Sequence, residues 1–330
     1  MKNATFPHVL AIFPHFPMSA QASFLSLVQH KQLRREKFLS EMDQVIPWSE
    51  MLAAIRPHYH DNVVGRPAKD LQMMLKIYFL QQWYNLSDPM MEEEICDKIS
   101  FQKFLQIDLL ADTVPDETTI LNFRHLLEAQ RLQETFLEIV NALLTERGYF
   151  MKKGTIVDAT LIAAPSSTKN KEKKRDPEMS QTKKGNQWYF GMKGHIGVDA
   201  DSGLVHSVEA TTAKVADIKM LGKLLTGEER SVFGDKAYSK EEDKVAARKA
   251  GILYAMSDRA KKNHPLSSSQ RKKNRKHSSI RSKVEHPFHV LKNLWHFRKV
   301  RYRGLTKNGL QLHTLFALCN LYLVRKRLLA

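Results

Sequence analysis

Apolar residues recur every three or four positions through most of the first 150 residues. This spacing is typical of amphipathic helices, and breaks at proline, glycine and asparagine separate one helix from the next. The predicted helices cover residues 34–46, 48–55, 70–84, 89–99, 101–105 and a segment that opens at 115. The pattern predicts an all-α N-terminal domain over residues 32–150, behind a poorly ordered extension over residues 1–31.

Two roles suit such a helical domain. Short helices joined by tight turns can include a helix-turn-helix reader of DNA, and Thr118 to His125 is the best candidate for its groove-facing helix. The alternative is a bundle used for packing or dimerisation. Residues 1–150 hold 14 Lys/Arg against 19 Asp/Glu, and this acidic balance favours the bundle.

Beyond Gly148 the apolar spacing changes to that of strands. The stretch from Gly154 to Pro165 has apolar residues in both alternation phases, as a central strand covered on both faces requires. Further strands are predicted at 188–198, 203–211, 231–233 and 252–256, and helices at 217–226 and 240–250. Three antiparallel strands followed by parallel strands reached through helices are typical of an RNase H-like mixed sheet. Residues 151–330 are therefore predicted to form an α/β catalytic domain with helices flanking this sheet.

Two segments of this second domain are strongly basic. Residues 166–185 hold seven Lys/Arg against three acids, and residues 259–283 hold ten Lys/Arg and no acid. Both are predicted as basic loops. The second is either a loop that orders on a phosphate backbone or a solubilising linker. A helix from residue 287 and a last helix over 310–323 complete the domain.

The charge of the chain favours a nucleic-acid partner. The formal net charge is +17, and residues 151–330 carry 38 Lys/Arg against 16 Asp/Glu, so the basic character belongs to one domain. A membrane-surface or solubilising role is the alternative. Two separated cysteines offer neither a disulfide framework nor a zinc site, and we find no secretory signal and no apolar run long enough to span a membrane. A reducing cytoplasm is therefore expected.

Asp158 is the one charged residue of the strand from Gly154 to Pro165. An unpaired carboxylate inside a sheet costs roughly several kcal/mol, so it is expected either in a structural ion pair or as a metal ligand. Asp235 has a similar place, directly after Gly234 at the end of a short strand. Because corresponding ends of neighbouring parallel strands lie close together, the two aspartates can hold divalent ions between them.

Glu285 is the only acidic residue from position 259 to the C-terminus. A glutamate isolated among so many cations is expected to be ion-paired or metal-bound, and the two aspartates favour the metal. Pro287 suits only the first turn of a helix, so Glu285 is expected near a helix start or a kink.

Several motifs surround these acids. They are Val157-Asp158-Ala159-Thr160, Ala164 to Asn170, Lys183 to Trp188, Gly234-Asp235-Lys236-Ala237-Tyr238 and Arg281 to Phe288. Together they resemble the bacterial insertion-sequence transposases of the IS5 group, within the DDE transposase class, and the resemblance extends from Met18 over nearly the whole chain. Arg281, Glu285 and Lys292 fit the spacing of the family's third-acid motif, whereas Ser278 stands where the family has tyrosine.

The resemblance implies a DNA transposase that binds the terminal inverted repeats of an insertion sequence, cleaves the ends and transfers them into target DNA. It implies Asp158, Asp235 and Glu285 as catalytic, metal-binding residues. The cofactor would be Mg²⁺, with Mn²⁺ as a possible substitute, as two ions roughly 3.5 to 4 Å apart that activate the attacking group and stabilise the leaving oxygen.

The resemblance also implies contacts with double-stranded DNA. Arg281 and Lys292 would hold phosphates of the transposon end. Trp188, beside Lys183 and Lys184, either stacks on an unpaired base or belongs to the core. Two DNA ends must be joined, so we expect at least a homodimer in the active complex, in the bacterial cytoplasm and associated with the nucleoid.

Two other functions stay open. An RNase H-like DNA nuclease without strand transfer would use the same acids, although the resemblance along the whole chain favours transposition. A catalytically silent, transposase-derived DNA-binding protein would be expected to have lost one of the three acids, and all three are present.

Overall fold

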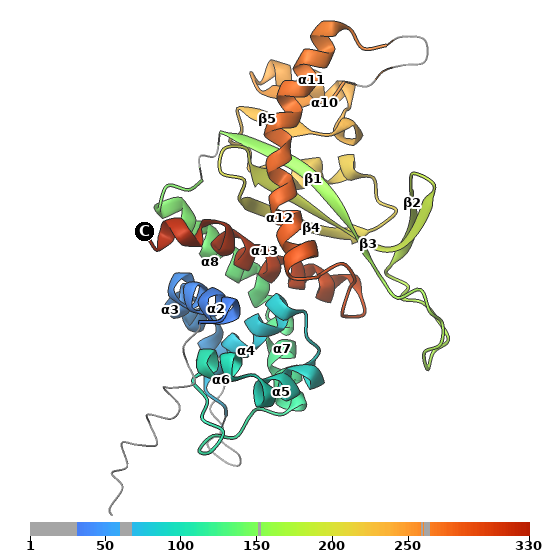
Figure 1. The fold of residues 1–330 in the computed structure, drawn as a ribbon. Helices are drawn as coiled ribbons and strands as arrows, with labels where there is room; N and C mark the ends of the chain where they lie inside the picture. The colour runs from blue at the N-terminus through green and yellow to red at the C-terminus, as the bar shows by residue number, and fades with distance from the viewer. Residues whose placement is uncertain (1–31, 60–67, 151–152, 259, 261–264) are drawn as a thin grey trace, which may run out of the picture.

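The computed structural model describes residues 32–59, 68–150, 153–258, 260 and 265–330. The predicted extension over residues 1–31 lies outside this part of the chain. The first half of the described chain is helical, as predicted (Figure 1). Its elements are α2 (Arg34–Val45), α3 (Trp48–Ile55), η1 (Arg56–His58), α4 (Leu71–Tyr84), α5 (Asp88–Asp97), α6 (Ile99–Leu105), α7 (Glu117–Ala129) and α8 (Leu132–Glu146).

Capping side chains set where several of these helices begin. Asp70 accepts a backbone N–H at the start of α4, as Ser87 does for α5 and Asp116 for α7. Helix α4 is buried on almost all sides, so it forms the centre of the helical region. It also buries Lys76, whose Nζ lies 3.0 Å from Asp43 Oδ1, and this pairing compensates the buried charge.

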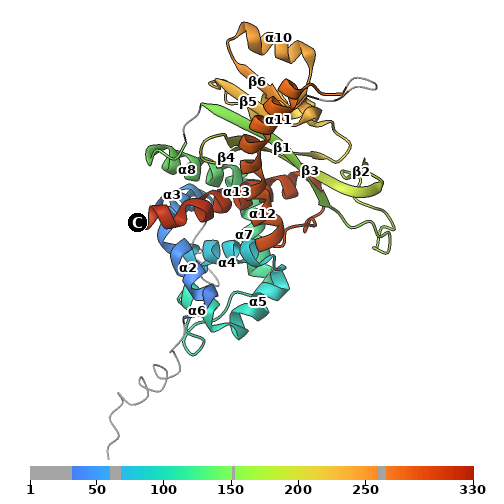
Figure 2. The same ribbon diagram turned by 45° about the horizontal axis from the view of Figure 1, so that its top comes forward.

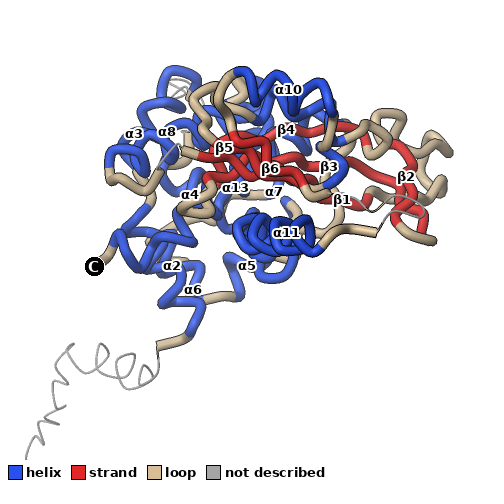
Figure 3. The backbone as a smooth tube through the Cα atoms, turned by 90° about the horizontal axis from the view of Figure 1, so that it is seen from above, coloured by secondary structure: helices blue, strands red, loops and turns tan. Residues whose placement is uncertain are grey.

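Six strands form one mixed sheet, which confirms the predicted α/β arrangement of the second half. They are β1 (Gly154–Ala163), β2 (Ser180–Lys184), β3 (Gln187–Asp199), β4 (Val205–Thr212), β5 (Ser231–Gly234) and β6 (Leu253–Met256). The strand order is β2-β3-β1-β5-β6, with β4 also paired to β3 (Figure 3). Strand β1 runs antiparallel to β3 and parallel to β5, so it is a central strand, as predicted.

The helical elements of the second half lie mostly on the two faces of this sheet. They are η2 (Asp217–Met220), α9 (Leu221–Leu224), η3 (Lys236–Tyr238), α10 (Glu241–Lys249), α11 (Ser268–Arg281), η4 (Ser282–Val284), α12 (Glu285–His289), the π-helical turn η5 (Val290–Leu294) and α13 (Leu305–Leu328). From α11 to η5 they form one unbroken helical path across one face of the sheet (Figures 1 and 2). On the opposite face, α9 and Tyr238 pack against Val157 and Val232.

Strand β2 lies inside the segment predicted as a loop over 166–185, so that prediction was wrong for residues 180–184. The strand pairs with the start of β3, with Ser180 opposite Gly191 and Lys184 opposite Gln187. Its side chains are polar and largely exposed, so backbone hydrogen bonds hold it without any apolar alternation.

Helix α11 occupies much of the segment predicted as a basic loop over 259–283, and that prediction was also wrong. Ser267 and Gln270 form a capping box at its start. Asn274 hydrogen-bonds the backbone N–H and carbonyl of Asp258, and the buried His277 ring meets Phe233 edge-on at 5.9 Å. The helix is thus fixed to the sheet through polar side chains, which a search for apolar periodicity does not detect.

Helix α13 is longer than the predicted 310–323 and joins the sheet to the N-terminal helices. Gln311 donates to Gln82 at 2.9 Å, and Thr314 lies 3.2 Å from the Tyr78 hydroxyl. One apolar cluster therefore includes residues from both sides of position 150, and the domain division there stays a prediction. Among the described helices, none combines the length and the apolar character needed to cross a bilayer.

Candidate active site

Parallel pairing of β1 with β5 brings two predicted acids to the same level of the sheet. Ile156 pairs with Phe233, and extending this register by two residues places Asp158 opposite Asp235. Neighbouring strands lie about 4.8 Å apart, and alternation puts both acids on the face that also bears Ile156 and Phe233. Asp235 directly follows β5 and caps η3, accepting the Ala237 N–H at 2.7 Å. The backbone thus fixes both aspartates where two strands adjoin.

Asp158 is a largely buried carboxyl, with 21% of its side chain exposed. Burial raises the pKa of Asp158 from 3.8 to about 6, although the Ala159 N–H and the charge of Arg281 lower it. The charges of Asp235 and Glu285 raise this pKa further, so all three predicted acids act on one another. A carboxyl perturbed by burial and by two like charges lies where more positive charge would be stabilising.

Glu285 comes from the helical path that crosses this face of the sheet. Arg281 ends α11, and Glu285 begins α12 after the three residues of η4. The sequence predicted a helix start or a kink near Glu285, and in the structure α12 begins at Glu285, with Pro287 in its first turn, although the 3₁₀ turn η4 joins it to α11 without a break. Because Arg281 and Glu285 are four residues apart, they project on one side of the path. Glu285 is exposed, and within the described residues no hydrogen bond or ion pair restrains its carboxylate.

Arg281 is the cation that faces Asp158. Its Nη2 lies 3.8 Å from Asp158 Oδ2, and its Nε is buried without a hydrogen-bond partner in the described part of the chain. A buried donor left unpaired costs free energy, so an added acceptor at this point would be stabilising. A phosphate oxygen is an acceptor that suits a guanidinium group.

The chemistry of the three acids suits a hard divalent cation. Each offers carboxylate oxygen, which Mg²⁺ and Mn²⁺ prefer, and burial together with the charges of Asp235 and Glu285 raises the pKa of Asp158. Within the described residues, however, no three His, Cys, Asp or Glu side chains converge into a metal-binding cluster. The acids fit such an ion by their chemistry and their mutual electrostatic influence, while Arg281 faces Asp158.

Lys292 lies beside the far end of β1. Its Nζ donates to the Leu161 carbonyl at 2.7 Å. Burial lowers the pKa of Lys292, and the nearby charges of Lys184 and Arg298 lower it further. The structure thus gathers two of the predicted DNA contacts, Lys184 and Lys292, into one basic group, to which it adds Arg298. Sequence analysis did not single out Arg298.

Trp188 lies on the hairpin formed by β2 and β3 and is 65% exposed, so the alternative of a core tryptophan was wrong. Lys183 pairs across the hairpin with Trp188, and its Nζ lies 6.0 Å from the indole ring. No hydrogen bond or ion pair joins this pair to the acids in the described part of the chain. The hairpin therefore presents an aromatic face and cations to solvent, separately from Asp158.

Tyr238 is a residue of the Asp235 motif to which sequence analysis gave no role. Its side chain is buried against Val157, and its hydroxyl has no hydrogen-bond partner among the described residues. Burial, together with the charges of Asp217, Asp158 and Asp235, raises the pKa of Tyr238 well above its usual value. The ring packs beneath the acids on the opposite face of the sheet, where its apolar surface supports the turn after β5.

The predicted groove-facing segment belongs to α7. Its arginine, Arg124, is buried, pairs with Asp88 at 2.9 Å and with Glu128 at 2.7 Å, and lies 4.3 Å from the centre of the Tyr302 ring. The Arg124 guanidinium is buried in ion pairs within the protein, so it is not available to contact DNA. The observation favours the packing alternative for α7.

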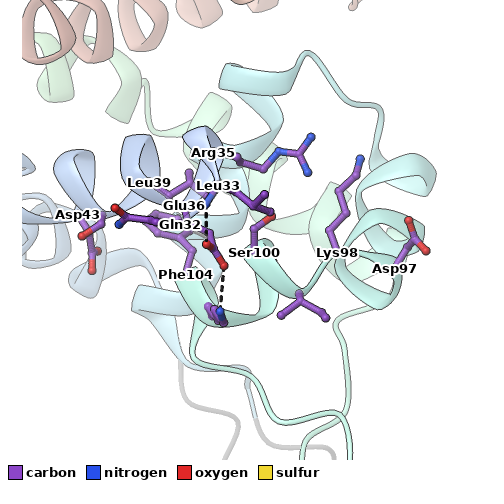
Figure 4. A pocket seen from close by; sticks show the side chains of 13 residues that line it. Gln32, Leu33, Arg35, Glu36, Leu39, Asp43, Asp97, Lys98, Ser100 and Phe104 are labelled. Atoms are coloured by element: carbon purple, nitrogen blue, oxygen red, sulfur yellow. Dashed lines mark hydrogen bonds and ion pairs between the residues drawn. The ribbon is translucent and has the colours of Figure 1, made fainter. Parts of the chain in front are cut away.

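A cavity of about 810 Å³ lies between α2 and α6 (Figure 4). Among its polar groups, the Glu36 carboxylate accepts the Leu33 N–H at 3.1 Å and Lys103 Nζ at 2.9 Å. None of the three predicted acids lines this cavity, so it is separate from the site around Asp158.

Two family models match the chain. The model described as Transposase DDE domain matches residues 149–321, more than half of the 330 residues. The model described as Transposase domain (DUF772) matches residues 27–126. The first match contains Asp158, Asp235 and Glu285. The chain therefore belongs to the DDE transposases, a family of phosphoryl-transfer enzymes.

Proposed function

We propose that this transposase belongs to the IS5 group, binds the terminal inverted repeats of an insertion sequence, cleaves the ends and joins them to target DNA. The observation that carries the proposal is the environment of Asp158. A central strand, the end of its parallel neighbour and a crossing helix bring three acids to one face of the sheet, where the charges of Asp235 and Glu285 act on Asp158.

The catalytic fold in this proposal is RNase H-like. Its support is the strand sequence, in which three antiparallel strands precede β5 and β6, and β5 lies parallel to the central β1. We also propose that residues 32–150 form a DNA-binding or dimerisation domain and residues 151–330 the catalytic domain. The two family models match separate segments, residues 27–126 and 149–321, and the second begins within two residues of this boundary, which supports the division.

Asp158, Asp235 and Glu285 would hold two divalent ions, Mg²⁺ or Mn²⁺. Ions bound there would supply Lewis-acid stabilisation of the charge that develops on the phosphate and on the leaving oxygen. Because Glu285 is exposed and unrestrained within the described residues, its carboxylate can turn toward Asp158 without breaking a hydrogen bond.

Arg281 and Lys292 would position the reacting DNA strand. The unpaired Nε of Arg281 suits a phosphate oxygen, and a phosphate would replace Asp158 as the anion facing this guanidinium. Lys292 is tied to β1 through the Leu161 carbonyl, so its ammonium is held at a fixed place beside the strand that bears Asp158. Both residues thus orient the phosphate, and neither needs to exchange a proton with the substrate.

The hairpin of β2 and β3 would hold the transposon end. Lys183 and Lys184 are exposed and suit phosphates, while the exposed Trp188 offers a face on which an unpaired base can stack. Two ends must be brought together for joining, so the active complex would be at least a homodimer. Its DNA substrate places the proposed enzyme in the bacterial cytoplasm, at the nucleoid.

The test is a joining assay on a labelled duplex that carries the element's terminal repeats, with Mg²⁺ or Mn²⁺ present. Native protein is expected to nick the ends and join them to a plasmid, whereas Asp158→Ala, Asp235→Ala and Glu285→Ala should bind the duplex and leave it intact. Nicking without joined products would instead establish a nuclease. Binding without any cleavage by the native protein would establish a catalytically silent DNA-binding protein.

A further inference from the structure

Helix α11 carries five exposed cations. They are Arg271, Lys272, Lys273, Arg275 and Lys276. Within the described part of the chain, no carboxylate lies at ion-pair distance from any of them, although ion pairs are frequent elsewhere in the protein. Five like charges within six residues repel one another, and this repulsion costs stability unless an anion is bound. We infer that α11 is the surface that holds the target DNA during joining, which rests on the proposed function.

The way in which α11 is anchored supports this inference. Asn274 and His277 occupy the side that faces the sheet, where they contact Asp258 and Phe233. Arg275 and Lys276 lie on the opposite side of the helix from Asn274 and His277, and both are exposed to solvent. The capping box at the start of α11 keeps the helix formed despite its charge. The fold thus holds the cations outward on a rigid support.

The α11 cations also lie close to the predicted acids along the chain. The helical path runs without a break from Lys276 through Arg281 to Glu285. Nine residues at about 1.5 Å each separate Lys276 from Glu285 by about 14 Å, which is less than half of one turn of duplex DNA, about 34 Å. Arg281 and Glu285 project towards Asp158, whereas Arg275 and Lys276 project to the solvent side of the same path, so a target duplex bound on α11 would reach the acids from the outer side of this helix.

Two basic surfaces lie on either side of strand β1, which bears Asp158. The hairpin with Lys184 adjoins the end of β1 at Ala163, whereas α11 contacts β5 on the other side of β1 (Figures 1 and 2). Joining requires two DNA molecules at one centre, and the hairpin, with the exposed Trp188, suits the transposon end. The α11 surface has long flexible cations and no exposed aromatic residue, so it suits a duplex bound through its backbone without regard to sequence.

The experiment uses a transposon end already cleaved at its 3′ terminus, so that only joining is measured. The variants are Arg275→Gln/Lys276→Gln and Arg275→Glu/Lys276→Glu. The matched control is Lys326→Gln/Arg327→Gln, a neighbouring exposed pair in the last turn of α13. We measure the Kd for the end, the joining rate into a plasmid, and the salt dependence of binding to a random duplex. Circular dichroism verifies that each variant is folded.

The α11 variants are expected to join at least about tenfold more slowly than the control at 0.1 M salt, with end affinity changed by less than about twofold. The slope of log K against log salt for the random duplex should fall by about 2 in the glutamine variant. Equal joining by the α11 and control variants would overturn the inference. Parallel loss of end affinity would also overturn it, because α11 would then hold the transposon end. If the native protein joins nothing, the proposed function fails, whereas the salt slope still tests α11 as a DNA surface.

Discussion

Replacing Asp158 with asparagine is expected to abolish catalysis and at the same time to stabilise the metal-free protein. The carboxyl of Asp158 is 21% exposed, and burial raises its pKa from 3.8 to about 6. Each tenfold change in an acid dissociation constant corresponds to about 1.4 kcal/mol, so the charged form costs the folded state about 3 kcal/mol. Asparagine has nearly the same shape, keeps an acceptor for the Ala159 N–H and carries no charge.

The raised pKa of Asp158 determines at which pH the Asp158→Asn substitution stabilises the protein. Because the folded pKa of Asp158 is higher than the unfolded one, its stabilising contribution is complete below pH 3.8 and is lost as the pH rises through about 6. The stability advantage of Asp158→Asn should therefore be small near pH 4 and reach up to about 3 kcal/mol at pH 8.

Thermal unfolding in EDTA, followed by circular dichroism at pH 4.5 and pH 8, measures this difference. Asp201→Asn serves as the control, because Asp201 is an exposed aspartate in the turn between β3 and β4. At pH 8 the Asp158→Asn protein should unfold several degrees higher than the native protein, and Asp201→Asn should change little. A lower unfolding temperature for Asp158→Asn at pH 8 would refute the reasoning, since the ion pair with Arg281 would then outweigh the burial of the carboxylate.

Three further substitutions test the surroundings of the site. Tyr238→Phe removes a buried hydroxyl without a partner in the described chain, so thermal unfolding should show unchanged stability or a gain of up to about 1 kcal/mol; a clear loss would reveal a hydrogen bond. Gly191→Ala would place Cβ 2.1 Å from the Ile162 carbonyl oxygen and should lower the free energy of unfolding by about 1–3 kcal/mol; native stability would contradict this packing. Trp188→Ala should change stability by less than about 0.5 kcal/mol yet weaken binding of ends with unpaired bases by about 1–3 kcal/mol; equal affinity in fluorescence titrations would exclude stacking.

The strands around the site could be predicted because each has a clear local signal. The central β1 has apolar residues in both alternation phases, and Gly234 marks where β5 ends, so the order of β1, β3, β4, β5 and β6 could be predicted from the chain alone, and the register of β1 with β5 agrees with the expected closeness of Asp158 and Asp235. Glu285 was predicted as the third acid because it is the only acid in a long basic region, and its role stays a prediction.

The elements that escaped prediction are those held by polar contacts. Strand β2 is fixed by backbone pairing to β3, and α11 by a capping box and by Asn274 and His277, none of which leaves an apolar period in the sequence. The contact between Arg281 and Asp158 also had no sequence signal, because it depends on how a helix and a strand pack on each other when these residues are 123 positions apart in the chain. Likewise, only the packed structure shows that Trp188 is exposed.

The central claim is that Asp158, Asp235 and Glu285 together bind divalent metal. The most direct measurement replaces Mg²⁺ with Fe²⁺ and adds ascorbate and peroxide, so that radicals formed at the bound iron cut the nearby polypeptide, and mass spectrometry locates the cuts. We predict cuts in all three segments that contain these acids, suppressed by excess Mg²⁺ and absent in Asp158→Ala. Cuts confined to one of the three segments, or cuts that persist in Asp158→Ala, would contradict a shared metal site.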